Sequence, residues 1–305
     1  MSMPLRCLLL SAFVATAQAV AATPPTPLPL EQNGGTWPSG HVQGIAVDVQ
    51  GGYIYYSFTN LLVKYDLNGK LIGTLLGWTG HLGDLDFNAS DGKVYGSLEY
   101  GKDKAFYVAV IDASRLDRVG IDASKTEIFR TVYLPEVSKD FTSGHYGCSG
   151  IDGVGIGPAF GRTDGPRYLT VAYGVYGDIE RSDNDHQVLL QYDVSDWNKL
   201  ARPFNEANLH HSGPNRVHGK YFVHTGNTTY GVQNLSYDDS LQRWFMGVYQ
   251  GKKPAFPNYL LFAVDARTQP KPGTLAGVGE QGQLLELAND GLKHAATGLR
   301  GWNQK

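Results

Sequence analysis

Cysteine is scarce in this sequence, which contains only Cys7 and Cys148 among 305 residues. Cys7 lies in a short apolar run that follows Arg6 and precedes small residues between Ala17 and Ala22, which is the layout of a secretory signal peptide. Removal of residues 1–22 would leave Cys148 as the one cysteine of the mature chain. An intramolecular disulfide is therefore excluded, and a packed core must stabilise the fold.

Long hydrophobic runs and an excess of positive charge are also missing. No stretch approaches the roughly 20 apolar residues of a membrane-spanning helix. The chain has 26 Lys and Arg against 29 Asp and Glu, a net charge of −3, so it lacks the basic footprint of a nucleic-acid-binding protein. We expect an exported monomer, extracellular or periplasmic, that binds neither nucleic acid nor membranes.

Common catalytic motifs are missing as well. The sequence contains no G-x-S-x-G elbow, no H-E-x-x-H pair and no phosphate-binding loop of the full G-x-x-x-x-G-K-S/T pattern. These absences leave serine hydrolases, zinc proteases of that type and P-loop enzymes without support.

Glycine and tyrosine are abundant, with 38 and 18 residues, and hardly any segment has a helical period. This composition is typical of many short strands joined by turns. Four stretches share one order: a histidine, an apolar strand, a tight turn, a Tyr-rich strand, a loop and a further strand. They begin at His41, His81, His145 and His224.

The first copy is the most regular of the four. It reads HVQGIAVD from His41, then YIYYSF, then a segment in which Asn68-Gly69 indicates a hairpin. A fifth copy begins after the strand-like QLLELA near Gln283, where the segment from His294 to Trp302 resembles another first strand, and it is not completed. Either the segment 28–38 supplies a strand that closes the ring, or the chain is shortened relative to its relatives. We predict one all-β domain over residues 23–305, a β-propeller of about five blades whose last blade is incomplete.

The predicted topology brings the four histidines together. In a propeller, the loop that enters each innermost strand and the loop after the second strand lie on the same face. Several imidazoles around one axis can bind a transition metal, so His41, His81, His145 and His224 are candidate ligands of a divalent metal (Ca, Mn or Zn). The alternatives are that these histidines only cap turns, or that they act directly in acid/base chemistry.

The loops on the same face carry the other candidate residues. Arg181 lies in the polar segment 177–187 and could bind a substrate carboxylate with its planar fork. Asp183 and Asp185 alternate there as calcium ligands do, although the full calcium-loop pattern is missing, and a solvated loop is the alternative. The cysteine in HYGCSG, Cys148, is either a thiol nucleophile or a small residue packed at the axis, and packing is favoured.

Lysines and tyrosines complete the predicted binding surface. Lys252 and Lys253 could attract an anionic substrate, although one of them could serve only solubility. Tyr100 and Tyr249 lie at the ends of second strands, where their rings could stack on sugars or simply pack the blades.

Three strings resemble a family of secreted bacterial and fungal propeller proteins: GHLGDLDFNASDGKVYGSLEY, YGCSGIDG and VAYGVYGDIERSDNDHQ. More distantly, the arrangement is similar to that of propeller enzymes that act on acidic glycans, such as rhamnose-glucuronate lyases and rhamnosidases. This resemblance implies a face-lining histidine with Arg or Lys, and in some members a metal.

We therefore expect a carbohydrate-active enzyme, a polysaccharide lyase or glycoside hydrolase, that acts on a uronic-acid-containing glycan. His81, His145 and Arg181 are the predicted catalytic residues, and Tyr100, Tyr249, Lys252 and Lys253 are the predicted substrate-binding residues. The alternative is a non-catalytic propeller that binds a glycan or a protein through the same face.

Overall fold

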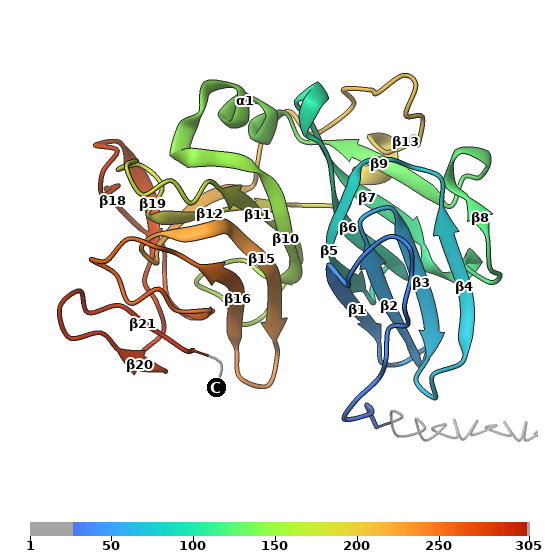
Figure 1. Cartoon of the computed structure of the whole chain (residues 1–305), viewed down its shortest axis with the longest axis horizontal. Coiled ribbons are helices and arrows are strands. Elements are labelled where there is room, and N and C mark those ends of the chain that lie inside the picture. The colour runs from blue at the N-terminus through green and yellow to red at the C-terminus, as the bar shows by residue number, and fades with distance from the viewer. Residues whose placement is uncertain (1–26, 304–305) are drawn as a thin grey trace, which may run out of the picture.

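The computed structural model describes residues 27–303, so the predicted signal peptide lies outside the described residues. This part of the chain folds mainly into antiparallel sheets that are arranged as the blades of a propeller (Figure 1). No helix within it is long and apolar enough to cross a membrane.

The strands of the first two blades follow the repeat order. Blade 1 consists of β1 (Gly44–Asp48), β2 (Tyr53–Phe58), β3 (Leu61–Asp66), β4 (Leu71–Leu76) and the short β8 (Ile121–Asp122). Blade 2 consists of β5 (His81–Asn88), β6 (Lys93–Tyr100), β7 (Ala105–Asp112), β9 (Phe129–Tyr133) and β13 (Arg202–Pro203).

The third blade is the largest and the fourth the smallest. Blade 3 consists of β10 (Cys148–Pro158), β11 (Arg167–Val175), β12 (His186–Tyr192), β14 (Gly219–His224), β19 (Gln281–Leu285) and β18 (Lys271–Thr274). Blade 4 consists of β15 (Thr228–Asp238), β16 (Arg243–Gln250) and β17 (Leu261–Asp265). Outside the blades lie the helix α1 (Pro135–Ser143) and the hairpin of β20 (Leu292–Lys293) and β21 (Arg300–Gly301).

Alternation of side chains builds the layers between blades. In blade 1, Tyr55 and Leu62 are buried in the core shared with blade 2, whereas Tyr56 and Val63 belong to a separate cluster on the opposite side of the sheet. This is the period of two that a strand imposes. The predicted hairpin at Gly69 is confirmed, because its N–H donates to the Asp66 carbonyl at 3.0 Å.

The ring has four blades, so the prediction of about five blades is wrong. The strand near Gln283 adds to blade 3, where β19 pairs in parallel with β14. The segment 294–302 also forms no blade, because Trp302 pairs with Leu261 at the edge of blade 4. The segment 294–302 resembles an inner strand in sequence. The open edges of blades 3 and 4 offer unpaired backbone donors and acceptors, so both segments pair with an existing blade instead of forming a new one.

The segment before β1 packs on blade 1 rather than closing the ring with a strand. The ring of Trp37 contacts that of Phe58, with 6.5 Å between centroids. Gln32 Nε2 donates to the Asp66 carbonyl at 3.0 Å. The outer side of blade 1 is thereby covered, and the outer side of blade 4 is covered in part by the segment that carries Trp302, whose ring lies 6.5 Å from that of Phe245.

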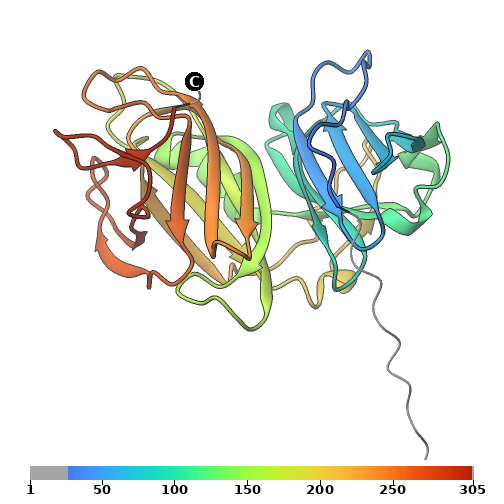
Figure 2. The same cartoon turned by 90° about the horizontal axis from the view of Figure 1, so that it is seen from below.

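The inner strands pack in the order β1, β5, β10 and β15. Figures 1 and 2 show blades 1 and 2 (blue to green) beside blades 3 and 4 (green to red), with β5 and β10 between them. The yellow segment that carries β13 runs from blade 3 to the edge of blade 2, where Arg202 pairs with Thr131. Blades 1 and 2 are therefore joined to blades 3 and 4 in two ways, by the packing of β5 against β10 and by the segment that carries β13.

One carboxylate at the axis holds three blades together. Asp84 on β5 is 3% exposed. Its Oδ2 accepts hydrogen bonds from Val154 N at 2.9 Å and Leu235 N at 2.8 Å, and its Oδ1 accepts one from Asn234 Nδ2 at 2.9 Å. The same Asn234 amide donates to the Gln43 carbonyl of blade 1 at 3.0 Å. The innermost strands of all four blades are thus linked near this point.

Candidate active site

Strand register defines the end of the propeller on which the candidate site lies. His81, at the start of β5, pairs with Glu99 near the end of β6, and Thr228, at the start of β15, pairs with Gln250 at the end of β16. The loops that follow the second strands therefore lie level with the starts of the inner strands. We call this end the loop face.

A histidine lies between two carboxylates on the loop face. His81 Nδ1 is 3.8 Å from Glu99 Oε2 and 4.0 Å from Asp152 Oδ1. The exposed fractions of the three side chains are 35%, 18% and 16%. A ligand can therefore reach this carboxylate–histidine cluster, yet each group is largely removed from water.

A β-bulge on β10 places Asp152 in this cluster. The register of β10 against β11 shifts between Ile151 and Val154, and bulges of this kind re-aim side chains. Just before it, Gly150 has a φ of +136°, and a Cβ there would meet the Glu99 carboxylate. The Glu99 carboxylate instead accepts a hydrogen bond from Ile151 N. The string SGIDG thus requires glycine where the strand approaches Glu99.

Blade 4 contributes an amide to the same cluster. Gln233 Nε2 donates to Asp152 Oδ2 and to the Tyr230 carbonyl, both at 2.9 Å. Tyr230 has a φ of +64°, a left-handed conformation that is uncommon for an aromatic residue and that costs about 1–3 kcal/mol. Strained backbone of this type is concentrated at binding and catalytic sites.

The three groups of the cluster influence one another's protonation. Burial raises the pKa of Asp152 to about 7; the negative charge of Glu99 adds to this rise, and His81 opposes it. The pairing with Glu99 raises the pKa of His81, against partial burial, which lowers it, and Asp152 adds to the rise. A carboxyl group with a raised pKa thus lies beside an imidazole whose charged form is stabilised, and this combination suits general acid/base catalysis.

A cavity of about 400 Å³ lies on the loop face, between blades 3 and 4. Its lining includes Tyr176, Asp178, Arg181, Tyr230 and Lys252. Tyr176 and Tyr230 are 46% and 55% exposed, so their rings are available to a ligand. The cavity and the carboxylate–histidine cluster meet at Tyr230, whose carbonyl shares Gln233 with Asp152.

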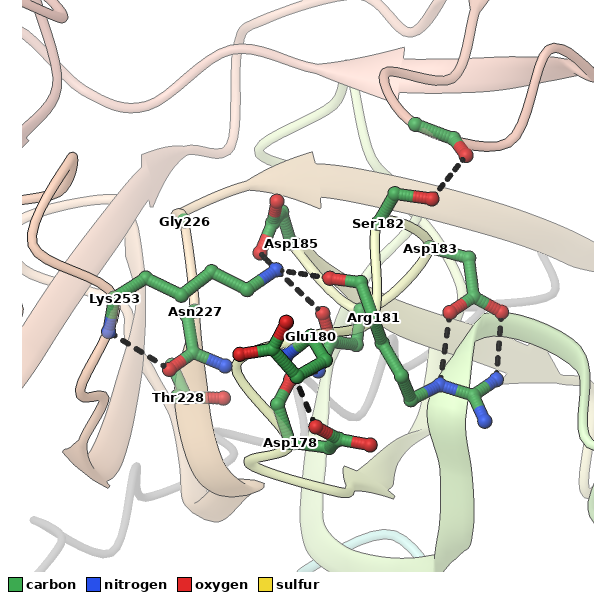
Figure 3. Close-up of polar contacts among 12 residues, drawn as sticks. Asp178, Glu180, Arg181, Ser182, Asp183, Asp185, Gly226, Asn227, Thr228 and Lys253 are labelled. Carbon is green, nitrogen blue, oxygen red and sulfur yellow. Dashed lines mark hydrogen bonds and ion pairs between the residues drawn. The ribbon is translucent and has the colours of Figure 1, made fainter.

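The loop between β11 and β12 carries Arg181 (Figure 3). Arg181 Nε and Nη2 donate to the Asp183 carboxylate at 2.9 and 2.7 Å, and Nη2 also donates to the Gly144 carbonyl at 2.7 Å. Two of its three nitrogens are thus engaged within the protein. Nη1 has no hydrogen-bond partner among residues 27–303, so bidentate capture of a carboxylate, as the sequence suggested, would require Asp183 to be displaced.

The two predicted lysines have different surroundings. Lys253 is 9% exposed, and its Nζ donates to Asp185 Oδ1 at 2.6 Å and Asn184 Oδ1 at 2.8 Å (Figure 3). This lysine fixes the loop. Lys252 is exposed and lines the cavity. Because Lys253 neutralises Asp185 and Arg181 neutralises Asp183, the calcium-loop alternative loses its free carboxylates.

The predicted tyrosines are also separated. Tyr249 is 50% exposed and pairs with Thr229, which lines the cavity. Tyr100 is 7% exposed, and its ring packs edge-on against Tyr107 with 6.4 Å between centroids. The ring of Tyr100 is therefore part of the packing between strands and is not available as a sugar platform.

The four predicted metal ligands have different neighbours. His41 contacts Gln43, whose Nε2 is 3.3 Å from His41 Nε2. The ring of His224 packs beside that of His186, and His145 lies 3.6 Å from Asp140. Among residues 27–303, no group of three or more His, Cys, Asp and Glu side chains could hold a metal ion. The residues present thus do not fit the predicted divalent metal.

Cys148 is buried at the start of β10 and forms no disulfide. Burial raises the pKa of its thiol to about 12, so the thiolate that a nucleophile requires is not populated near neutral pH. The packing interpretation of this cysteine agrees with its position.

Asp152, Gln233 and Tyr230 were not singled out by the sequence analysis. One signal was present: VQNLSYD aligns with VQGIAVD, so Gln233 within β15 and Gln43 just before β1 occupy equivalent positions in the repeat. A polar residue that recurs at the same position of the repeat, next to the propeller axis, indicates a side chain that lines the axis. The bulge that aims Asp152 has no comparable signal in a single sequence.

No protein-family model matches the chain, and no curated protein is significantly similar to it. Among solved structures, it is similar to hydrazine synthase of Kuenenia stuttgartiensis, with a TM-score of 0.41 and 14% identity over 73% of this chain and 51% of that one. It is also similar to the Dos1 propeller, with a TM-score of 0.38 and 12% identity over 84% of this chain and 60% of that one. The chain thus spans between half and three fifths of these proteins. The β-propeller architecture rests on the strand order of the four sheets and on the packing of their inner strands.

Proposed function

We propose that this protein is an enzyme that acts on a uronic-acid-containing glycan, with the carboxylate–histidine cluster as its acid/base centre. The observation that carries this proposal is the position of His81 between Glu99 and Asp152, within 4.0 Å of both carboxylates. Raised pKa values of partly buried groups in contact with one another are typical of catalytic sites.

The adjoining cavity supports an anionic sugar as the substrate. Lys252 and the guanidinium of Arg181, which is paired with Asp183, lie with Asp178 in the same lining as the exposed ring of Tyr176, and sugar rings stack on such aromatic surfaces. A uronate carboxylate placed between these cations would be partly neutralised. This neutralisation lowers the barrier to removal of the proton on the adjacent carbon, because negative charge develops on the carboxylate in the transition state.

An elimination follows from these roles. The Asp152 carboxylate accepts the proton from the carbon next to the uronate carboxyl group. The His81 imidazolium donates a proton to the glycosidic oxygen as the bond between this oxygen and the ring carbon breaks. A double bond then forms between this ring carbon and the neighbouring carbon that lost its proton. Glu99 orients His81 and stabilises its charged form, as a carboxylate does for histidine in catalytic triads. Asp152 is thus the base and His81 the acid.

The test is an assay of the mature protein on uronate polysaccharides, such as polygalacturonate and alginate, for ultraviolet-absorbing unsaturated products. We expect product with at least one substrate, and we expect Asp152→Asn and His81→Asn each to reduce kcat by about 10²-fold or more, since acid/base groups contribute about 10²–10⁴-fold. Asp164→Asn is the matched control, because Asp164 has an 82% exposed side chain.

The outcomes separate the competing functions. Cleavage that gives only saturated products would overturn the elimination mechanism and show that the enzyme is a hydrolase. Binding of a glycan by the unmodified protein without any product would overturn the enzymatic proposal and favour the non-catalytic alternative, for which the exposed rings of Tyr176, Tyr230 and Tyr249 are the supporting observation.

Export is part of the same proposal, because polymeric glycans of this kind lie outside the cytoplasm. Expression of the full chain in a secreting host, followed by mass spectrometry, should give a mature protein that begins near Thr23. Recovery of a chain that retains residues 1–22 would refute export by this route.

A further inference from the structure

A second cavity lies between the outer strands of blade 3 and the C-terminal hairpin. Its volume is about 400 Å³, which is within the usual size range of small-molecule sites. Segments far apart in the sequence enclose it: β12, β14 and β19 of blade 3, and the residues from Thr297 to Arg300. None of the residues assigned above to the acid/base centre lines this cavity.

One wall of this cavity is apolar. Phe222 on β14 and Leu284, Leu285 and Leu287 on and after β19 line it. Apolar side chains around a concave space stabilise a bound apolar body, at roughly 25 cal/mol for each Å² removed from water. The cavity is therefore suited to a ligand with a hydrocarbon or aromatic part.

Two histidines supply hydrogen-bonding groups. His186 and His224 are directly opposite one another on β12 and β14, with 5.0 Å between ring centroids. His186 is 3% exposed, and its Nδ1 has no hydrogen-bond partner among the residues that the structure describes. A buried polar atom left without a partner is unfavourable, so a ligand that supplied this partner would remove the penalty.

Both histidines are neutral near pH 7. Burial, with a smaller contribution from His224, lowers the pKa of His186 to about 4, and burial also lowers the pKa of His224. A neutral imidazole offers one donor and one acceptor. The two histidines can therefore form hydrogen bonds with a polar ligand atom, but they add no positive charge to the cavity.

Arg300 gives the cavity its positive charge. The one hydrogen bond of its side chain within the described part of the chain is a long one, from Nη1 to the Gly291 carbonyl at 3.5 Å, and no carboxylate of residues 27–303 forms an ion pair with it. The acidic residue of the lining, Glu286, is instead paired with Lys271 at 3.0 Å. A guanidinium with free donors next to an apolar wall is suited to a carboxylate.

We propose that this cavity is a binding site for a small amphipathic organic anion. Arg300 binds the carboxylate, Phe222 and the leucines contact the apolar body, and His186 accepts or donates one hydrogen bond. This site is separate from the carboxylate–histidine cluster, so it stands or falls independently of the proposed enzymatic function.

The first experiment uses the dye 8-anilinonaphthalene-1-sulfonate, an aromatic anion whose fluorescence rises in apolar surroundings, as the probe on the mature protein. We expect saturable binding of about one dye per chain. Octanoate should displace the dye, and octanol, which has the same chain length without the charge, should be at least 10-fold weaker. Displacement by octanol as effective as that by octanoate would overturn the assignment of an anion.

Variants locate the site. Arg300→Gln should weaken competition by octanoate about 10-fold or more, since hydrogen bonds to charged groups contribute about 1.5–3 kcal/mol. Arg267→Gln is the matched control, because Arg267 pairs with Asp265 outside the cavity. Leu284→Trp, which fills the cavity and retains Arg300, should abolish dye binding while the melting temperature remains near that of the unmodified protein. Unchanged binding in the folded Arg300 or Leu284 variant would refute the site.

Discussion

Asp84 allows a quantitative test of how the blades are held together. In Asp84→Ala, the N–H groups of Val154 and Leu235 lose the carboxylate oxygen to which both now donate. Each buried donor left without an acceptor costs about 1–3 kcal/mol, so the free energy of unfolding should fall by about 2–6 kcal/mol. In Asp84→Asn, one carbonyl oxygen can still accept both hydrogen bonds, and the loss should be near 1 kcal/mol at low pH.

The pH dependence provides the sharper part of this test. Burial raises the pKa of Asp84 to about 8, although hydrogen bonds from Asn234, Leu235 and Val154 oppose the rise. The unfolded chain releases this proton near its ordinary pKa of about 4. Between these pH values the folded state binds more protons, so the free energy of unfolding decreases as pH rises. Asp84→Asn cannot ionise and should lack this decrease.

The assay is urea unfolding of the unmodified protein and of both Asp84 variants between about pH 5 and about pH 9, followed by tryptophan fluorescence. The exposed-site variant Asp164→Asn serves as the control. Parallel stability curves for the unmodified protein and Asp84→Asn across this range would refute the raised pKa. A loss below about 1 kcal/mol in Asp84→Ala would refute the assignment of Asp84 as the joint between blades.

Three further predictions concern the loop face. If Asp152 is the base, kcat/KM should rise with pH through about pH 7, where its pKa lies, and a pH profile that stays flat there would exclude this role. Gly150→Ala should destabilise the fold by about 1–3 kcal/mol and lower activity, because its methyl group would meet the Glu99 carboxylate; a melting temperature and kcat equal to those of the unmodified protein would contradict this. Lys253→Met should lower the free energy of unfolding by about 3–5 kcal/mol, since it leaves Asp185 as an uncompensated, largely buried charge, and calorimetry that finds no loss would disprove the ion pair.

The repeat pattern predicted much of the fold. The alternation of the first copy gives β1 to β4, and the Asn68-Gly69 turn lies where the sequence indicates it. The number of blades was overestimated because a strand pattern does not specify its partner. The segment 294–302 resembles an inner strand in sequence, and only tertiary packing decides that Trp302 pairs with Leu261 at the edge of blade 4.

The helix α1 and the composition of the candidate site could not be predicted from the repeat pattern. Four histidines at similar positions in the repeats suggested one shared site, but strand lengths differ between blades. His224 ends β14 of blade 3 rather than preceding β15 directly, and His145 lies in a turn before β10, next to Asp140 of α1. His81 remains at the centre of the candidate site because its strand begins at the histidine itself.

The loop that carries Arg181 is fastened at both ends, by Arg181 to the Gly144 carbonyl and by Lys253 to Asp185. The cavity wall therefore exists before any ligand arrives, and little conformational entropy is lost when one binds. Selectivity in such a preorganised site depends on shape and on the few unengaged donors, Lys252 and one guanidinium nitrogen. Ligands that cannot present an anion to those donors have little to gain from the rest of the wall.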